Sequence, residues 1–293
     1  MDKITVVGAG TMGNGIAHVF AQHGHDVTLV DTNPTALDRA RATIDRNLGR
    51  QVAKGRLTGE QQRDTLARLA TSTELTQAAS RAALVVEAAT ENPAVKLEIF
   101  RQLDAAAPPS AILATNTSSI SITQIAAATE RPAQVIGMHF MNPVPVMRLV
   151  EVIRGYATSD ATTARVMSWS AALDKTAVEV NDYPGFVSNR VLMPMINEAI
   201  YALWQGVAQV EAVDTVMILG MAHPMGPLHL ADFIGLDVCL SILRVLQEGM
   251  GTDRYAPCPL LVNMVAAGRL GVKTGEGFYK YEAGGKEKTP VAF

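Results

Sequence analysis

Short apolar segments alternate with helical patterns along roughly the first 180 residues of the chain. Helical spacing is clear in 16–20 and in 93–103, where Pro93 stands near the start. This alternation is typical of an α/β fold with a doubly wound, mainly parallel sheet. The apolar runs that predict strands, many of them rich in β-branched residues, lie at 4–7, 26–31, 84–88, 111–114, 134–139, 149–153 and 177–180.

The pattern changes after the turn Asp182-Tyr183-Pro184-Gly185. We place a domain boundary there, with one domain at 1–182 and a second at 183–293. The second has only helical patterns, so we predict an all-α domain. We expect its polar end, Glu282 to Phe293, to be frayed until the last residues. The helical patterns cover about 186–205, 210–222, 228–249 and 258–268.

A glycine motif, Gly8-Ala9-Gly10-Thr11-Met12-Gly13, follows the first predicted strand and opens a helix. In this context Gly8 permits a tight turn, Gly10 lets the backbone approach a pyrophosphate, and Gly13 allows close packing of helix on strand. The next strand ends at Asp31, near the spacing expected for a carboxylate that binds a ribose 2′-hydroxyl. The first domain is therefore predicted to be of the Rossmann type. It should prefer NAD to NADP, because Asp31 repels a 2′-phosphate and no arginine follows it.

A histidine and a glutamate lie on either side of a rigid turn. His139 closes one apolar run, Glu151 lies in the next, and the prolines of 142–145 interrupt the strand pattern between them. A lone histidine at a strand end is more often structural than catalytic. If the two strands lie together, however, the carboxylate can fix the tautomer of the ring and leave its other nitrogen to accept a proton.

The placement of several candidates favours the catalytic interpretation of His139. The glycine turn, Asp31, the segment Asn116–Ser119 and His139 all fall at the carboxyl ends of predicted strands. Open α/β sheets bind their ligands at that edge. A dinucleotide beside a His–Glu pair suits the oxidation of a secondary alcohol.

Composition narrows the function classes. Hydrophobic residues make up 48% of the chain, yet no apolar run approaches a membrane span and no leader precedes the first strand, so we expect a cytoplasmic protein without a membrane partner. Cys239 and Cys258 lack metal-ligand spacing and the six histidines form no cluster, so we predict no metal. The net charge of −3 argues against a nucleic-acid partner.

One locally basic stretch departs from this composition. Arg39, Arg46, Arg50 and Lys54 recur at spacings of seven and four residues, which places them on one face of a helix. Such a stripe is usually a solvated surface. The functional alternative is a binding site for a phosphorylated substrate.

The chain resembles the 3-hydroxyacyl-CoA dehydrogenase family, most closely its short bacterial 3-hydroxybutyryl-CoA dehydrogenases. The resemblance covers nearly the whole chain and implies NAD as cofactor, a 3-hydroxyacyl-CoA substrate and a homodimer. The motifs that carry it are Gly8–Gly13, Val85–Asn92, Asn116–Ser119, His139–Glu151, Asp182–Arg190, Pro224–Pro227 and Lys273–Tyr279.

The resemblance also implies roles for individual residues. His139 is expected to be the general base, oriented by Glu151, with Ser118 and Asn189 near the substrate oxygen and the histidine. Asn189 follows the domain boundary, so we expect the two domains to close on the substrate. The residues implied in cofactor binding are Gly8, Gly10, Thr11, Met12, Gly13, Asp31, Glu91, Lys96, Asn116, Ser118 and Lys273.

For coenzyme A, the resemblance adds Lys54 as a phosphate-binding residue and Asn47 at a position that is often serine in the family; Ser118 and Asn189 complete the implied substrate site. The sequence leaves acyl-chain length open, and 3-hydroxyadipyl-CoA or longer substrates stay possible. Another alternative is a β-hydroxyacid dehydrogenase that acts without CoA, of the 6-phosphogluconate or hydroxyisobutyrate type, but those enzymes use a lysine base instead of a His–Glu pair. A non-catalytic, NADH-binding structural protein is the alternative of another class, against which the intact His139–Glu151 pair argues.

Overall fold

The computed structural model describes residues 1–282 and 288–293. Contacts within the chain divide it into two compact units, Met1–Tyr183 and Pro184–Phe293. Each unit has its own hydrophobic core.

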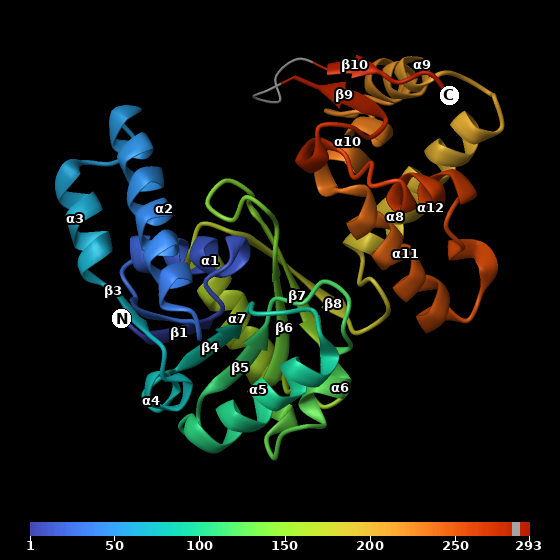
Figure 1. Ribbon diagram of the computed structural model, residues 1–293. Helices are drawn as coiled ribbons and strands as arrows, with labels where there is room; N and C mark the ends of the chain where they lie inside the picture. The colour runs from blue at the N-terminus through green and yellow to red at the C-terminus, as the bar shows by residue number, and fades with distance from the viewer. Residues whose placement is uncertain (283–287) are drawn as a thin grey trace. The chain divides into compact units, whose positions relative to one another are not determined.

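The first unit is built on an eight-stranded sheet of order β3-β2-β1-β4-β5-β6-β7-β8 (Figure 1). β6 and β7 are antiparallel, and every other neighbouring pair is parallel. The predicted doubly wound, mainly parallel sheet is confirmed. The strands are β1 Lys3–Val7, β2 Asp26–Val30, β3 Leu69–Ser72, β4 Leu84–Glu87, β5 Ile112–Thr115, β6 Val135–Phe140, β7 Leu149–Arg154 and β8 Thr176–Asn181.

Helices cover both faces of this sheet. α1 and α7 pack on one face, with α2 and α3 against α1, and α4, α5 and α6 cover the other face (Figure 1). Asn33 caps α2 and Asn92 caps α5 through their side chains, each followed by a proline in the first turn. The helices are α1 Thr11–Gln22, α2 Pro34–Ala53, α3 Gly59–Ala67, α4 Leu75–Ala79, α5 Pro93–Ala106, α6 Ile122–Ala126, η1 Pro132–Gln134 and α7 Asp160–Ala172.

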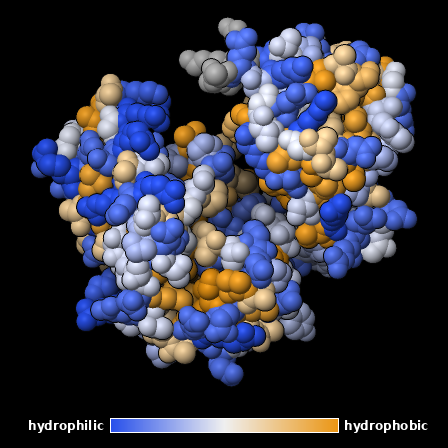
Figure 2. Space-filling view, viewed as in Figure 1, coloured by the Kyte–Doolittle hydropathy of each residue, from blue (hydrophilic) through white to orange (hydrophobic). Residues whose placement is uncertain are grey.

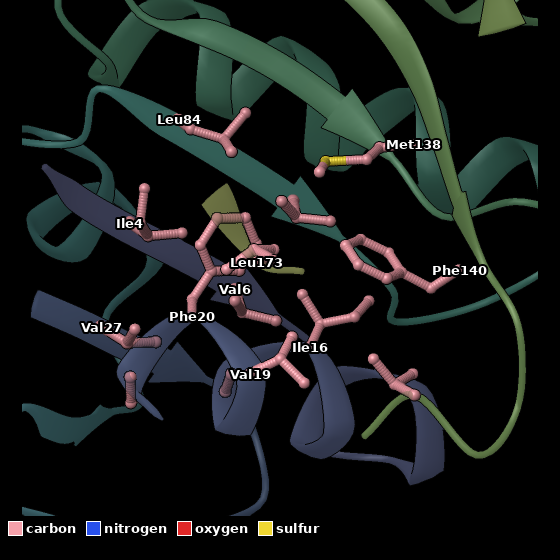
Figure 3. Close-up of a cluster of buried hydrophobic side chains, with 14 of the residues drawn as sticks. Ile4, Val6, Ile16, Val19, Phe20, Val27, Leu84, Met138, Phe140 and Leu173 are labelled. Atoms are coloured by element: carbon pink, nitrogen blue, oxygen red, sulfur yellow. The ribbon is translucent and has the colours of Figure 1, made fainter. Parts of the chain in front are cut away.

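The alternation of side chains along the strands decides which residues can reach the site. In β6, Met138 and Phe140 join the core beneath α1, together with Phe20 (Figure 3). Successive residues of a strand point to opposite faces. His139 therefore points to the other face, which α6 covers at Gly137 through Ile122.

The second unit is mainly helical, as predicted, and also contains a two-stranded antiparallel sheet of β9 and β10. The single helix predicted at 228–249 is wrong: Gly235, with φ of 104°, separates α10 from α11. Its elements are α8 Ser188–Trp204, α9 Val210–Thr215, the π-helix η2 Val216–Gly220, α10 Pro227–Ile234, α11 Leu236–Met250, η3 Asp253–Tyr255, α12 Pro259–Ala266, η4 Val272–Thr274, β9 Tyr279–Tyr281 and β10 Lys288–Pro290.

The end of the chain differs from the predicted frayed tail. Lys288–Pro290 pairs with β9, and the ring of Phe293 packs against Phe278. The prediction of a frayed tail is therefore wrong for 288–290, whereas the packing of Phe293 agrees with the expectation that the last residues are ordered. The part of the prediction at 283–287 lies outside the described residues.

Two buried aspartates account for the glycine-rich motifs of the second unit. Asp214 accepts hydrogen bonds from the backbone N–H groups of Leu228 and His229, and Asp232 accepts from those of Phe278 and Tyr279. A Cβ at Gly226 or Gly277 would overlap these carboxylates. Burial raises the pKa of Asp232 to about 6. The motif at 273–279 thus supplies backbone donors to Asp232, and the motif at 224–227 leads directly into the two residues that donate to Asp214. The hydroxyl of Tyr279 also donates to Asp214 and that of Tyr281 to Asp232, so each buried carboxylate has several hydrogen-bond partners.

Candidate active site

The glycine turn joins β1 to α1 at the carboxyl edge of the sheet. Gly8 has a φ of 101°, and a Cβ there would lie 2.6 Å from the carbonyl oxygen of Ala88. A Cβ at Gly13 would lie 1.7 Å from the oxygen of Gly8, whereas one at Gly10 would meet no atom within 4 Å. The geometry thus matches the predicted demands on the three glycines: a left-handed turn, an open approach for a ligand and close helix packing.

The amino end of α1 is available to an anion. Its N-cap is Gly10, no side chain of the described residues caps it, and no acidic residue lies in its first turn, which begins with Thr11 and Met12. Helix amino ends bind phosphate through their unpaired N–H groups and the helix dipole. The strand order also reverses here, between β1 and β4, which is the usual position of dinucleotide sites in such sheets.

A cavity of about 810 Å³ opens beside this turn. Asp31 and Thr32 are among its polar lining residues, and Leu75, Val95 and Ile99 contribute apolar lining. A carboxylate for a ribose and an apolar wall for a flat ring fit the adenosine half of a dinucleotide. The sequence analysis did not assign these apolar residues to the site. The spacing of Val95 and Ile99, which places both on one face of the predicted helix, could have indicated them.

Asp31 also holds the turn itself. Its Oδ2 accepts a hydrogen bond from the N–H of Ala9 at 2.8 Å, and its Oδ1 accepts from the N–H of Asn33 at 2.9 Å. Each carboxylate oxygen can accept a further hydrogen bond. The residue can therefore fix the glycine turn and bind a ribose hydroxyl at the same time.

His139 and Glu151 face each other across the antiparallel strands β6 and β7. They are direct partners in the register, both are buried, and Nδ1 of His139 lies 2.8 Å from Oε2 of Glu151. The contact expected from the sequence is confirmed. A carboxylate has no proton to give, so Nδ1 is the donor and the basic lone pair of the ring is on Nε2.

The loops that follow β4 and β5 are joined to each other next to this pair. Glu91 accepts hydrogen bonds from the hydroxyl of Thr117 at 2.6 Å and from the N–H of Ser118 at 3.0 Å. Asn116 accepts from the N–H of Phe140, one residue after the histidine, at 2.9 Å. The structure thus brings Glu91, Asn116 and Ser118 together at the edge that carries the histidine.

A buried ion pair lies beneath these loops. Lys96 of α5 contacts the carboxylate of Glu87, which also accepts hydrogen bonds from the hydroxyl of Thr115 at 2.9 Å and the N–H of Ala89 at 2.9 Å. The hydroxyl of Thr115 in turn accepts from the N–H of Thr117. The sequence analysis assigned no role to Glu87 or Thr115. The feature that could have indicated a role for Glu87 is its carboxylate at the end of an otherwise apolar predicted strand.

The other candidates lie on separate elements. Asn47 and Lys54 are seven residues apart on α2 and at its C-cap, so they share one helical face. Lys273, in η4, pairs with Asp237. Asn189 is a buried residue in the first turn of α8. Lys273 and Asn189 belong to the second unit, and Asn47 and Lys54 belong to the first.

Two negative findings concern the described part of the chain. It contains no helix with the length and apolar character that crossing a membrane would require. Nor do its histidines, cysteines and acids form a group that could hold a metal ion. Cys239 and Cys258 are free and buried.

Comparisons with known proteins cover both units. A model described as the NAD binding domain of 3-hydroxyacyl-CoA dehydrogenase matches residues 3–183, and one described as the C-terminal domain matches residues 185–281. A probable 3-hydroxybutyryl-CoA dehydrogenase of Bacillus subtilis is 56% identical over 280 residues, covering 96% of this chain and 97% of that protein. The 3-hydroxybutyryl-CoA dehydrogenase of Bradyrhizobium diazoefficiens is 54% identical over 279 residues, covering 95% of each.

A solved structure has the same fold over nearly its full length. The crystal structure of (S)-3-hydroxybutyryl-CoA dehydrogenase from Ralstonia eutropha matches with a TM-score of 0.94 and 47% identity. The match covers 97% of this chain and 100% of that one.

Proposed function

The chain belongs to the 3-hydroxyacyl-CoA dehydrogenase family, and on this premise we propose that it oxidises (S)-3-hydroxybutyryl-CoA to acetoacetyl-CoA and catalyses the reverse reduction. The observation that carries the proposal is the buried His139–Glu151 pair, held 2.8 Å apart at the sheet edge that also presents the glycine turn. A general base and a dinucleotide site at one edge are what alcohol oxidation requires.

In the oxidation, Nε2 of His139 accepts the proton of the 3-hydroxyl group. Glu151 keeps the imidazole in the required tautomer and stabilises the imidazolium that forms. NAD, when bound, supplies the acceptor for the hydride that leaves the hydroxyl-bearing carbon. In the reduction, the imidazolium returns the proton to the developing alkoxide. Ser118 and Asn189 are proposed to bind the substrate oxygen.

The cofactor residues follow from the turn and the cavity. The N–H groups at the start of α1 would hold the pyrophosphate, and Asp31 the adenosine ribose. Glu91, Lys96 and Asn116 are proposed for the nicotinamide half, with Lys273 from the second unit. Because Lys96 is buried against Glu87, its contribution includes fixing the loop after β4.

The enzymatic test is NAD(P)H absorbance with 3-ketoacyl-CoA thioesters of increasing chain length, including 3-oxoadipyl-CoA. We expect the highest kcat/KM with acetoacetyl-CoA and a lower KM for NADH than for NADPH. A higher kcat/KM with a longer or dicarboxylic thioester would replace the proposed substrate. Binding of NADH without turnover of any thioester would instead favour the non-catalytic alternative.

Lys54 is proposed to bind a phosphate of coenzyme A, with Asn47 on the same helical face. Replacing Lys54 with alanine removes one charge-assisted hydrogen bond. If that costs about 1 kcal/mol, KM for acetoacetyl-CoA rises roughly fivefold with kcat nearly unchanged.

Steady-state kinetics with acetoacetyl-CoA and with acetoacetyl-pantetheine, which lacks the nucleotide phosphates, checks this role. The variant should lose its defect with the truncated substrate. Lys3→Ala, at an exposed lysine in β1, is the matched control and should behave as wild type. An equal rise in KM for both substrates would contradict phosphate binding.

We further propose that the enzyme is a homodimer formed through its helical unit. Val216, Leu219 and Met221 are exposed within six positions of one another, around the π-helix η2. On the face of this unit that Figure 2 shows, hydrophobic residues also lie among the polar ones. Clustered exposed apolar side chains are typical of subunit interfaces.

We propose the cytoplasm as the location of the protein. Its two cysteines are free and buried, which suits a reducing compartment.

Sedimentation velocity checks the dimer. Wild-type protein should sediment with about twice the 31.2 kDa mass of the chain. Leu219→Glu places a charge in the proposed interface and should shift the protein to the monomer, whereas Tyr156→Glu, at an exposed site of the first unit, should leave the dimer intact. A monomeric wild type, or a dimeric Leu219→Glu variant, would contradict this interface.

A further inference from the structure

The turn between β6 and β7 connects the two strands that carry the catalytic pair. Within it, the carbonyl oxygen of Pro143 accepts hydrogen bonds from the N–H groups of Val146 and Met147, each at 2.9 Å. His139 lies a few residues before the turn and Glu151 a few residues after it. A displacement of the turn would therefore reach both members of the pair.

One side of the turn rests on the helix that begins at the glycine motif. Val144 is buried in the core of the first unit, whereas Val146 and Met147 are exposed. A Cβ added at Gly15 of α1 would lie 2.8 Å from the Cβ of Val144. Glycine is less favourable than alanine inside a helix, so its presence in the second turn of α1 has a steric reason. The absence of a side chain there gives Val144 its place on the helix.

The other side of the turn is held by Lys175. Its Nζ donates hydrogen bonds to the carbonyl oxygens of Val144 and Met147, each at 2.6 Å. The N–H of the next residue, Thr176, donates to the carbonyl oxygen of Arg148 at 2.7 Å. Burial, and then the charge of Arg148, lowers the pKa of Lys175. The lysine thus gives up part of its hydration to bind two backbone carbonyls of a single turn.

We propose that Lys175 is a positioning residue for the His139–Glu151 pair, acting through the turn that it fixes against Gly15 of α1. The same turn then sets the pair relative to the helix whose amino end faces the cofactor. A misplacement of about 1 Å between reacting groups can cost as much as 10²-fold in rate. This inference rests on the proposed function, because it concerns the efficiency of that base.

The first test compares Lys175→Met with Arg148→Met, which removes the same charge from the same region but leaves both lysine contacts in place. Lys175→Met should lower kcat about 10-fold and leave KM for NADH within about twofold. Arg148→Met should be close to wild type. In cofactor-free protein labelled with 15N-histidine, the His139 ring signals should shift in Lys175→Met and stay in place in Arg148→Met.

The second test asks whether the lysine acts through the histidine. In a His139→Gln background, Lys175→Met should lower the residual rate by less than about twofold, because the group that it positions is gone. The same 10-fold loss in that background, or a Lys175→Met enzyme with normal kcat, would overturn the positioning role.

Gly15→Ala offers an independent route if Lys175→Met fails to fold. It pushes the turn from the helix side while improving helix propensity, so it should lower kcat in the same direction without lowering stability through the helix itself. Unchanged kcat in Gly15→Ala would contradict the proposal. A wild-type enzyme inactive with every 3-ketoacyl-CoA would overturn the proposed function itself, whereas an active wild type with unaffected variants would overturn only the positioning role.

Discussion

Replacing His139 with glutamine is expected to lower kcat for acetoacetyl-CoA reduction by about 100-fold or more, because a positioned general acid–base group contributes roughly 10² to 10⁴-fold. Glutamine fills a similar volume and keeps a polar group opposite Glu151, but it cannot exchange a proton with the substrate. KM for NADH should change little, since the residues proposed to bind the cofactor lie on the glycine turn and the neighbouring loops. Steady-state kinetics in both directions measures the effect.

Two further variants make this prediction specific. Glu151→Gln keeps a hydrogen-bond acceptor for Nδ1 but removes the charge that stabilises the imidazolium. It should therefore lower kcat measurably, but by a smaller factor than His139→Gln. His23→Gln alters a histidine at the C-cap of α1, outside the site, and should leave kcat unchanged. Near-normal turnover in His139→Gln would show that another group is the base and would remove the basis of the mechanism.

The contact between His139 and Glu151 was predictable because it depends on local features. Two short apolar runs separated by prolines have few arrangements other than neighbouring strands, and β6 and β7 are antiparallel. The register then places His139 directly opposite Glu151. The glycine motif was predictable for the same reason, since strand, turn and helix follow one another without interruption.

Contacts between distant segments were not predictable from pattern alone. Glu87 reads only as the end of an apolar strand, and its partner Lys96 reads as one polar residue of an amphipathic helix. Lys175 binds carbonyl oxygens 28 and 31 residues earlier in the chain. Every residue has a backbone carbonyl, so the sequence does not indicate which of them a side chain will bind. Such positions become visible only when the packing of α5 and β8 is known.

The predicted element boundaries were wrong where the apolar spacing continued across a break in a helix. Leu228, Leu236 and Leu240 are all buried, so the periodicity predicts one helix although Gly235 interrupts it with a positive φ. β3 was not predicted because its sequence, Leu69–Ser72, is short and mostly polar or small. The pairing of β9 was missed for a similar reason, since three residues form no pattern.

The largest stability effect is expected from Lys96→Met. The side chains of Lys96 and Glu87 are 1% and 0% exposed, so methionine would leave a carboxylate in the core without its cation. Breaking a buried ion pair on one side typically destabilises a protein by about 3–5 kcal/mol. For a unit of this size, the melting transition of the first unit should fall by roughly 6–20 °C.

The same helix provides the matched control. Arg101 and Glu98 also pair on α5, but their side chains are 55% and 56% exposed. Arg101→Met should therefore have little effect on the melting transition, because exposed ion pairs contribute little to stability. Differential scanning calorimetry of both variants, with the two units resolved as separate transitions, measures the contrast.

A double variant separates the lost pair from lost packing. Glu87→Gln in the Lys96→Met background removes the unpaired charge; its side-chain oxygen can still accept from the N–H of Ala89, and its NH2 group can donate to the hydroxyl oxygen of Thr115. It should recover more than half of the lost stability if the buried charge is the cause. Equal melting points for the single and double variants would instead assign the loss to the missing lysine stem. Because Thr115 also accepts from the N–H of Thr117, next to Ser118, recovery of stability should bring back the loop that the cofactor and substrate are proposed to share.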